Sequence, residues 1–156
     1  MATALAVAQR FLDLAAAEGK TLTNMKLQKL VFFAHGVYLA GFDAPLIEEP
    51  IRAWDFGPVI PPLYEKLRKY GRDKVDFDLA PETRSTLEND PQADEAIMAV
   101  WEAYRNHTAI QLSQITHLPK TPWDQIWNRP DGRYEMIPNA IIKEYYKNRV
   151  QRNAGT

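Results

Sequence analysis

Residues Thr23–Tyr38, TNMKLQKLVFFAHGVY, decide the fold, because they predict a helix that is apolar on nearly every side. One face carries six apolar side chains at helical spacing: Leu27, Leu30, Val31, Ala34, Val37 and Tyr38. Met25, Phe32 and Leu39 form a second apolar strip. Since a surface helix needs a polar face, we predict a buried central helix that begins after Thr23 as the N-cap residue and ends at Gly41. Gly36 costs roughly 1 kcal/mol relative to alanine inside a helix, so we expect another backbone to cross closely there.

Bulk composition limits the possible functions of the chain. The 156 residues suit one domain, and the formal net charge of −1 provides no overall attraction to nucleic acid or to a membrane. The chain has no cysteine, which excludes disulfides and thiolate chemistry. Arg10 and Asp13 interrupt the apolar N-terminus, so it does not read as a signal peptide. We therefore expect a cytoplasmic protein that does not enter the membrane.

The rest of the chain predicts further helices and very little sheet. Apolar spacing and turn residues predict five helical segments around the central one: Ala2–Glu18, Val59–Tyr70, Gln92–Asn106, Ala109–Thr116 and Asn139–Val150, with a short sixth at Pro122–Trp127. Extended pieces are expected at Ile51–Phe56, which Gly57-Pro58 breaks, at Lys74–Leu79 and at Tyr134–Ile137. The fold class is thus mainly α: a compact single-domain helical bundle (1–150) with two short strands or a small β-hairpin, formed by Ile51–Phe56 and the extended piece near Tyr134, and a flexible tail (151–156).

Searches for catalytic and metal-binding patterns find no recognised motif. Ser113, His117 and Asp124 can be combined into a triad on paper, but no nucleophile elbow accompanies them. The interpretation that we favour is that Thr116 and His117 close a helix end and hydrogen-bond the next turn. His35 is expected to be a satisfied, partly buried histidine. We therefore predict no enzyme, no metal and no cofactor.

The stretch Trp54–Val59, WDFGPV, is the best candidate for a binding site. Tryptophan and tyrosine dominate binding hot spots, and on a strand Trp54 and Phe56 would point to the same side with Asp55 opposite. The alternative, that the rings only fill the core, carries about equal weight. The predicted partner-binding residues are Trp54, Asp55, Phe56, Pro58, Val59, Tyr64 and Trp123.

An ordered set of motifs resembles a known family. The set comprises Met25-Lys-Leu-Gln-Lys-Leu, Trp54-x-Phe56-Gly57-Pro58-Val59, Leu63-Tyr64, Tyr70-Gly71, Leu112-Ser113, Thr116-His117, Pro122-Trp123 and Ile137-x-x-x-Ile141. This order is similar to the Panacea antitoxin domain, also called the SocA-like or GepA-like phage-associated family. The resemblance implies a mainly α-helical antitoxin that neutralises a cognate toxin by direct protein contact and has no catalytic residues.

Several alternatives remain open. The resemblance also implies, for the SocA branch, a proteolytic adaptor that delivers the toxin to the ClpXP protease. A homodimer is a further alternative. A nucleic-acid role for the basic C-terminal helix (Lys143, Lys147, Arg149 and Arg152) is not favoured, because basic residues also suit a solvated helix C-terminus.

Overall fold

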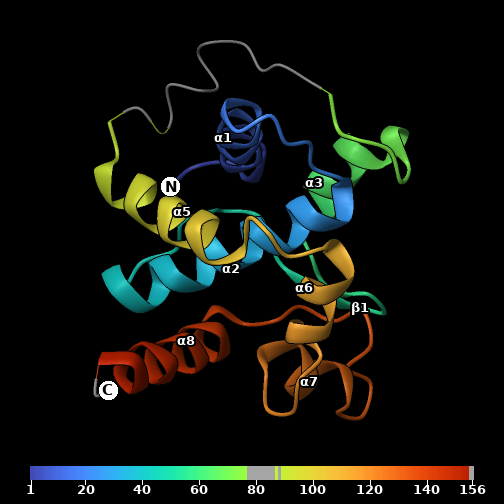
Figure 1. Ribbon diagram of the computed structural model, residues 1–156. Coiled ribbons are helices and arrows are strands. Elements are labelled where there is room, and N and C mark those ends of the chain that lie inside the picture. The colour runs from blue at the N-terminus through green and yellow to red at the C-terminus, as the bar shows by residue number, and fades with distance from the viewer. Residues whose placement is uncertain (77–86, 88, 155–156) are drawn as a thin grey trace.

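Helix α2 (Asn24–Phe42) lies at the centre of the computed structural model, which describes residues 1–76, 87 and 89–154 (Figure 1). The Thr23 hydroxyl accepts a hydrogen bond from the Lys26 N–H at 3.3 Å, so Thr23 is the N-cap as predicted. Seven of the nine side chains in the two apolar strips are buried, and Met25 and Val37 are half-buried, which confirms the central position of this helix. Its end differs from the prediction: the helix continues past Gly41 to Asp43, whose left-handed backbone (φ 57°) ends it. Aspartate adopts this conformation more readily than most residues.

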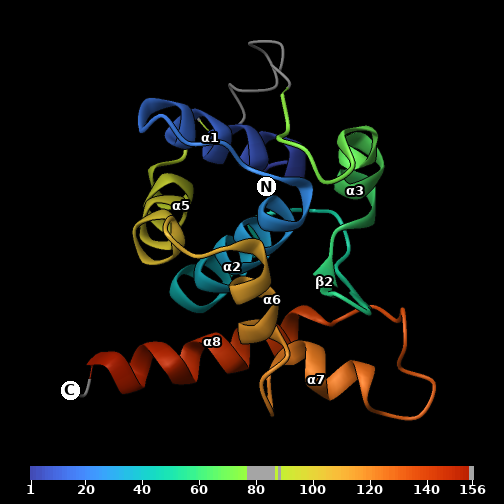
Figure 2. The ribbon, with the colours of Figure 1, turned by 45° about the vertical axis from the view of Figure 1, so that its right-hand side comes forward.

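Three helices form layers on opposite sides of α2. Helices α1 (Ala4–Ala17) and α5 (Pro91–Tyr104) cover one side, and α8 (Asn139–Ala154) crosses the other, as both ribbon views show (Figures 1 and 2). Aromatic pairs join the layers, with Phe33 of α2 stacked 4.7 Å from Tyr104 of α5. Helix α8 extends beyond the predicted end at Val150. Within the described residues, no helix combines the length and the apolar character needed to cross a membrane.

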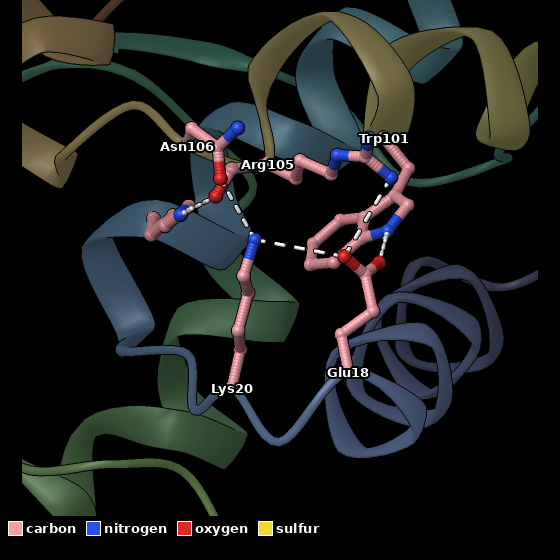
Figure 3. Close-up of polar contacts among 6 residues, drawn as sticks. Glu18, Lys20, Trp101, Arg105 and Asn106 are labelled. Carbon is pink, nitrogen blue, oxygen red and sulfur yellow. Dashed lines mark hydrogen bonds and ion pairs between the residues drawn. The ribbon is translucent and has the colours of Figure 1, made fainter.

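A single carboxylate connects the ends of α1 and α5 (Figure 3). Glu18, the C-cap residue of α1, accepts a hydrogen bond from the Trp101 indole N–H and lies 3.6 Å from both Lys20 Nζ and Arg105 Nη1. The indole hydrogen bond and these two cations lower the pKa of Glu18. Lys20 also donates to the Asn106 side chain at 2.8 Å. The cluster explains why two helices far apart in the sequence end at the same place.

The contact at Gly36 is not the predicted one. The nearest group is a side chain of the crossing helix α8 and not its backbone: the Tyr146 ring lies against the glycine, so that an added Cβ would be 2.5 Å from the ring carbons Cδ2 and Cε2. The missing side chain therefore makes room for an aromatic ring, and α8 packs directly on the backbone of α2.

The small sheet corrects one prediction and confirms another. Strand β1 (Arg52–Trp54) pairs antiparallel with β2 (Gly57–Val59), in the register Arg52↔Val59 and Trp54↔Gly57. Gly57-Pro58 therefore begins a strand instead of only breaking one. The expected pairing near Tyr134 also exists, on the other edge of β1, where the Ala53 N–H donates to the Glu135 carbonyl at 2.9 Å.

The remaining elements complete the end of the molecule that carries the hairpin. Helix α3 (Pro61–Leu67) is followed by the 3₁₀-helix η1 (Arg68–Tyr70), and it starts later than predicted because Val59 belongs to β2. Helices α6 (Ala109–Thr116) and α7 (Pro122–Trp127) have the predicted bounds, with Thr108 and Thr121 as N-caps. Lys74 pairs with Thr23, but the second half of the extended piece predicted at Lys74–Leu79, residues 77–79, lies outside the described residues.

Candidate functional site

The turn of the hairpin, Trp54–Pro58, is held by side chains from three other helices. We call these five residues the hairpin tip. Four of its backbone carbonyl oxygens each lie within hydrogen-bond distance of a side-chain nitrogen or hydroxyl. The contacts are Trp123 Nε1 to Trp54 O (2.6 Å), His117 Nε2 to Asp55 O (3.2 Å), Ser113 Oγ to Phe56 O (2.8 Å) and Lys29 Nζ to Pro58 O (3.1 Å). Because α7, α6 and α2 supply these groups, the tip is attached to the body of the protein through its backbone.

Turning the carbonyl groups inward leaves side chains of the tip facing solvent. Phe56 is 61% exposed, and Asp55 is exposed beside it. Trp54 and Tyr64 are half-buried, with their rings 5.1 Å apart in an edge-to-face arrangement. An exposed aromatic side chain is informative where it belongs to a larger apolar surface, and here Phe56 follows the half-buried Trp54 on the same turn. The tip therefore presents an apolar group that the fold itself does not use.

The predicted partner-binding residues divide between the surface and the core. Trp54, Asp55, Phe56 and Tyr64 reach the surface. Pro58, Val59 (5% exposed) and Trp123 (6% exposed) are buried, so for them the core alternative describes the structure. The expectation that Trp54 and Phe56 share one side of a strand was wrong, because β1 ends at Trp54 and the chain turns at Asp55 and Phe56.

Two further aromatic residues extend this surface. Tyr134, which is 52% exposed, has its ring 6.4 Å from Trp54 and 5.4 Å from Trp127. Trp127 stacks on Trp123 at 5.5 Å, and the Arg133 guanidinium lies 5.1 Å over the Trp127 ring. The spacing of Trp123 and Trp127 on one helix was visible in the sequence. The position of Tyr134 beside Trp54 follows from the pairing expected between Ile51–Phe56 and the extended piece near Tyr134, because this backbone pairing brings the two rings together.

The catalytic triad that could be assembled from Ser113, His117 and Asp124 does not form. Ser113 Oγ donates to the Phe56 carbonyl, and the Asp124 carboxylate accepts from the Lys120 N–H and from the Asn128 side chain. The favoured interpretation of this segment is confirmed: Thr116 Oγ1 donates to the Ser113 carbonyl at 2.7 Å, which closes the end of α6.

His35 is buried, and each of its ring nitrogens has a polar partner, as expected from the sequence. Its Nδ1 accepts from the Ile47 N–H at 3.4 Å, and its Nε2 lies 2.8 Å from Asn139 Oδ1. Burial lowers the pKa of this ring. Among the side chains that the structure describes, no group of three or more histidine or carboxylate residues is arranged to hold a metal ion.

Lys29 is the least ordinary member of the site. Its side chain is 1% exposed, and no ion pair within the described residues involves it. Burial lowers its pKa from 10.5 to about 7. Its amine lies directly beneath the tip, where a Cβ on Gly57 would be 2.9 Å from Lys29 Cε. The lysine therefore connects the buried central helix α2 to the exposed hairpin tip.

The buried amine predicts a pH dependence of stability. Because its pKa is about 7 in the folded state and 10.5 for a lysine exposed to water, between these values the unfolded chain keeps a proton that the folded chain has lost. Stability should therefore rise with pH across this range, by at most about 1.4 kcal/mol per pH unit. Urea unfolding of the wild type and of Lys29→Met at pH 7, 8 and 9 measures this, since the variant lacks the titrating group.

Lys66→Met on the exposed face of α3 is the matched control, and we expect its pH profile to follow the wild type. A difference between wild type and Lys29→Met that stays constant with pH would contradict the assignment.

The comparisons with known proteins agree with this arrangement. The family model described as "Antitoxin SocA-like, Panacea domain" matches residues 27–124, a range that holds the tip and all four groups that contact its carbonyls. Antitoxin SocA of Caulobacter vibrioides (strain NA1000 / CB15N) is 34% identical over 154 aligned residues, which cover 92% of this chain and 82% of that protein. No solved structure gives a significant match. The chain therefore belongs to the SocA-like antitoxin family that the Panacea domain defines.

Proposed function

We propose that this protein is an antitoxin that neutralises a cognate protein toxin by direct contact, and that the hairpin tip is part of the contact surface. Family membership supports the antitoxin role. The observation that carries the location is the exposed Phe56 on a turn whose backbone is held from inside the protein.

A turn of this kind suits tight binding for an energetic reason. Binding costs free energy when loops and side chains must become ordered, at roughly 0.5–1.5 kcal/mol for each immobilised side chain. The tip meets part of this cost during folding, because Ser113, Trp123 and Lys29 already fix its carbonyl groups. Phe56 can then insert into a pocket of the toxin without further ordering of its backbone.

Phe56→Ala tests the proposal. We expect toxin affinity to fall by roughly 30-fold or more, since removing a hot-spot aromatic costs about 2 kcal/mol or more. The free energy of unfolding should change by less than about 0.5 kcal/mol, because the side chain is mostly exposed. Calorimetric titration with the cognate toxin measures the first quantity, urea unfolding measures the second, and rescue of growth on co-expression gives the cellular result.

A second pair of variants tests whether the negative charge at the hairpin tip contributes to toxin binding. Asp55→Asn removes an exposed carboxylate at the tip, whereas Glu102→Gln removes one on α5, away from the hairpin in both ribbon views (Figures 1 and 2). Only the first should change toxin affinity. Unchanged affinity in both Phe56→Ala and Asp55→Asn would move the contact surface elsewhere.

The proposed role involves no catalysis, and it places the encounter with the toxin in the cytoplasm. A serine-directed probe that labels Ser113 would contradict the absence of catalysis.

The alternative hypothesis is a proteolytic adaptor that delivers the toxin to ClpXP. The toxin half-life, measured with and without the protease while the antitoxin is present, separates delivery from simple blocking.

A further inference from the structure

Both ring nitrogens of His117 face backbone carbonyl oxygens. The residue is the C-cap of α6, where Nδ1 lies 2.6 Å from the Ser113 carbonyl oxygen and Nε2 lies 3.2 Å from the Asp55 carbonyl oxygen. A carbonyl oxygen only accepts hydrogen bonds, so each nitrogen must donate for both contacts to be favourable. A neutral imidazole carries one N–H, and only the imidazolium carries two.

The orientation of the ring follows from the shorter contact. Turning the ring by 180° would place Cδ2 at about the position of Nδ1, and a carbon 2.6 Å from the Ser113 oxygen is far closer than the ~3.3–3.6 Å of a C–H···O contact. The Thr116 hydroxyl lies 3.3 Å from Nδ1, but it donates to the same Ser113 carbonyl at 2.7 Å. Nδ1 is therefore a donor, and the charge state of the ring depends on Nε2 and Asp55.

The surroundings can hold a cationic ring. The Trp123 indole lies under it with the ring centres 3.9 Å apart, and an aromatic face stabilises a cation. The ionisable side chains on the surrounding segments include Asp55 of the hairpin, Lys120 and Asp124 at α7, Lys29 of α2, and Arg149 of α8, which lines a hollow with Thr116 and Trp123. Within the described residues, no carboxylate forms an ion pair with His117, so the two carbonyl groups and the indole provide its stabilising contacts.

We infer that His117 is a positioning residue of the hairpin tip, which as an imidazolium holds the Asp55 carbonyl and the Ser113 carbonyl together. Loss of the Nε2 proton turns the contact with Asp55 into two opposed lone pairs. The exposed tip then moves away from α6 on that side. The consequence for toxin affinity rests on the proposed function; the protonation state and the movement of the tip do not.

Nuclear magnetic resonance on the free protein tests the inference without the toxin. The chain has three histidines, so His→Gln variants assign every ring. At pH 6 both nitrogens of His117 should carry the imidazolium signature, whereas His35, whose Nδ1 accepts a hydrogen bond, should show a neutral tautomer. On raising the pH to 8.5, the amide signals of Asp55 and Phe56 should follow the titration of His117. A neutral His117 ring at pH 6 would overturn the inference. Amide signals of Asp55 and Phe56 that do not change while the ring titrates would overturn it as well.

Two variants separate the effect of His117 from that of Lys29, whose pKa of about 7 lies within the pH range of the experiment. The amide shifts of the tip should persist in Lys29→Met and vanish in His117→Gln, while His107→Gln, on the loop before α6, should leave them unchanged. Should His117→Gln not fold, the ring signals of the wild type still decide the matter.

A second measurement uses the toxin. Affinity should fall roughly three- to tenfold between pH 6 and pH 8, about the value of one hydrogen bond, and His117→Gln should remove this dependence. Affinity that is independent of pH would overturn a role for His117 in toxin binding, while Phe56→Ala reports separately on the contact itself.

Discussion

Replacing Gly57 with alanine should destabilise the protein by about 3 kcal/mol or more and abolish toxin neutralisation. Gly57 has φ +116°, which L-residues rarely adopt, and a Cβ would lie 2.8 Å from Thr116 Oγ1 and 2.9 Å from Lys29 Cε. Both neighbours have little freedom to move, because the Thr116 hydroxyl donates a hydrogen bond at the end of α6 and the Lys29 amine donates one to the Pro58 carbonyl. The added methyl group must therefore push the tip off its supports.

Gly71→Ala is the matched control for this substitution. Gly71 also has a positive φ, +57°, but an added Cβ meets no atom within 4 Å. Only backbone strain remains there, roughly 1–3 kcal/mol because its ψ of −123° lies outside the left-handed helical region, and the toxin affinity should be unchanged. Urea unfolding and toxin titration of both variants measure the difference. Equal destabilisation by the two substitutions would show that the contacts beneath Gly57 contribute nothing.

Gly36→Ala should destabilise the protein by about 1–3 kcal/mol, although alanine favours helices over glycine. The methyl group would lie 2.5 Å from the Tyr146 ring, which is buried between α8 and α2. Either α8 moves away from α2 or the ring leaves its position, and in both cases apolar packing is lost. The change is measured by urea unfolding and by the near-ultraviolet signal of the aromatic residues.

The same helix supplies the control. At Gly41 an added Cβ meets nothing within 4 Å, so Gly41→Ala should stabilise the protein by about 0.5–1 kcal/mol, the ordinary preference of a helix for alanine. Opposite signs for the two substitutions would establish the Tyr146 contact; a gain of stability at both positions would contradict it. Since α8 supplies none of the four groups on the tip, Gly36→Ala should retain toxin affinity in the molecules that remain folded.

Local patterns predicted several elements correctly because local interactions form them. Thr23, Thr108 and Thr121 cap the helices that follow them with their own hydroxyl groups, and Pro122 begins α7. The burial of α2 also followed from its sequence, since apolar residues on both faces leave no side that favours water.

The errors arose where a residue's role depends on a distant partner. Gly57-Pro58 reads locally as a break, yet it begins β2 because Arg52–Trp54 offers a pairing edge. Gly36 indicated a close approach, but the approaching group, the Tyr146 ring, is 110 positions along the chain. Val59 and Trp123 were predicted to contact a partner, and only the packed structure shows that both side chains are buried.

The sequence by itself determined the mainly helical class, the buried central helix and the family, because periodicity, capping and motif order are properties of neighbouring residues. Only the tertiary structure decided what the motifs do together. Lys29, Ser113, His117 and Trp123 lie on three helices, and packing brings all four to the carbonyl groups of one turn. The physical reason is that backbone carbonyl groups in a turn need donors, and here the folded core supplies them.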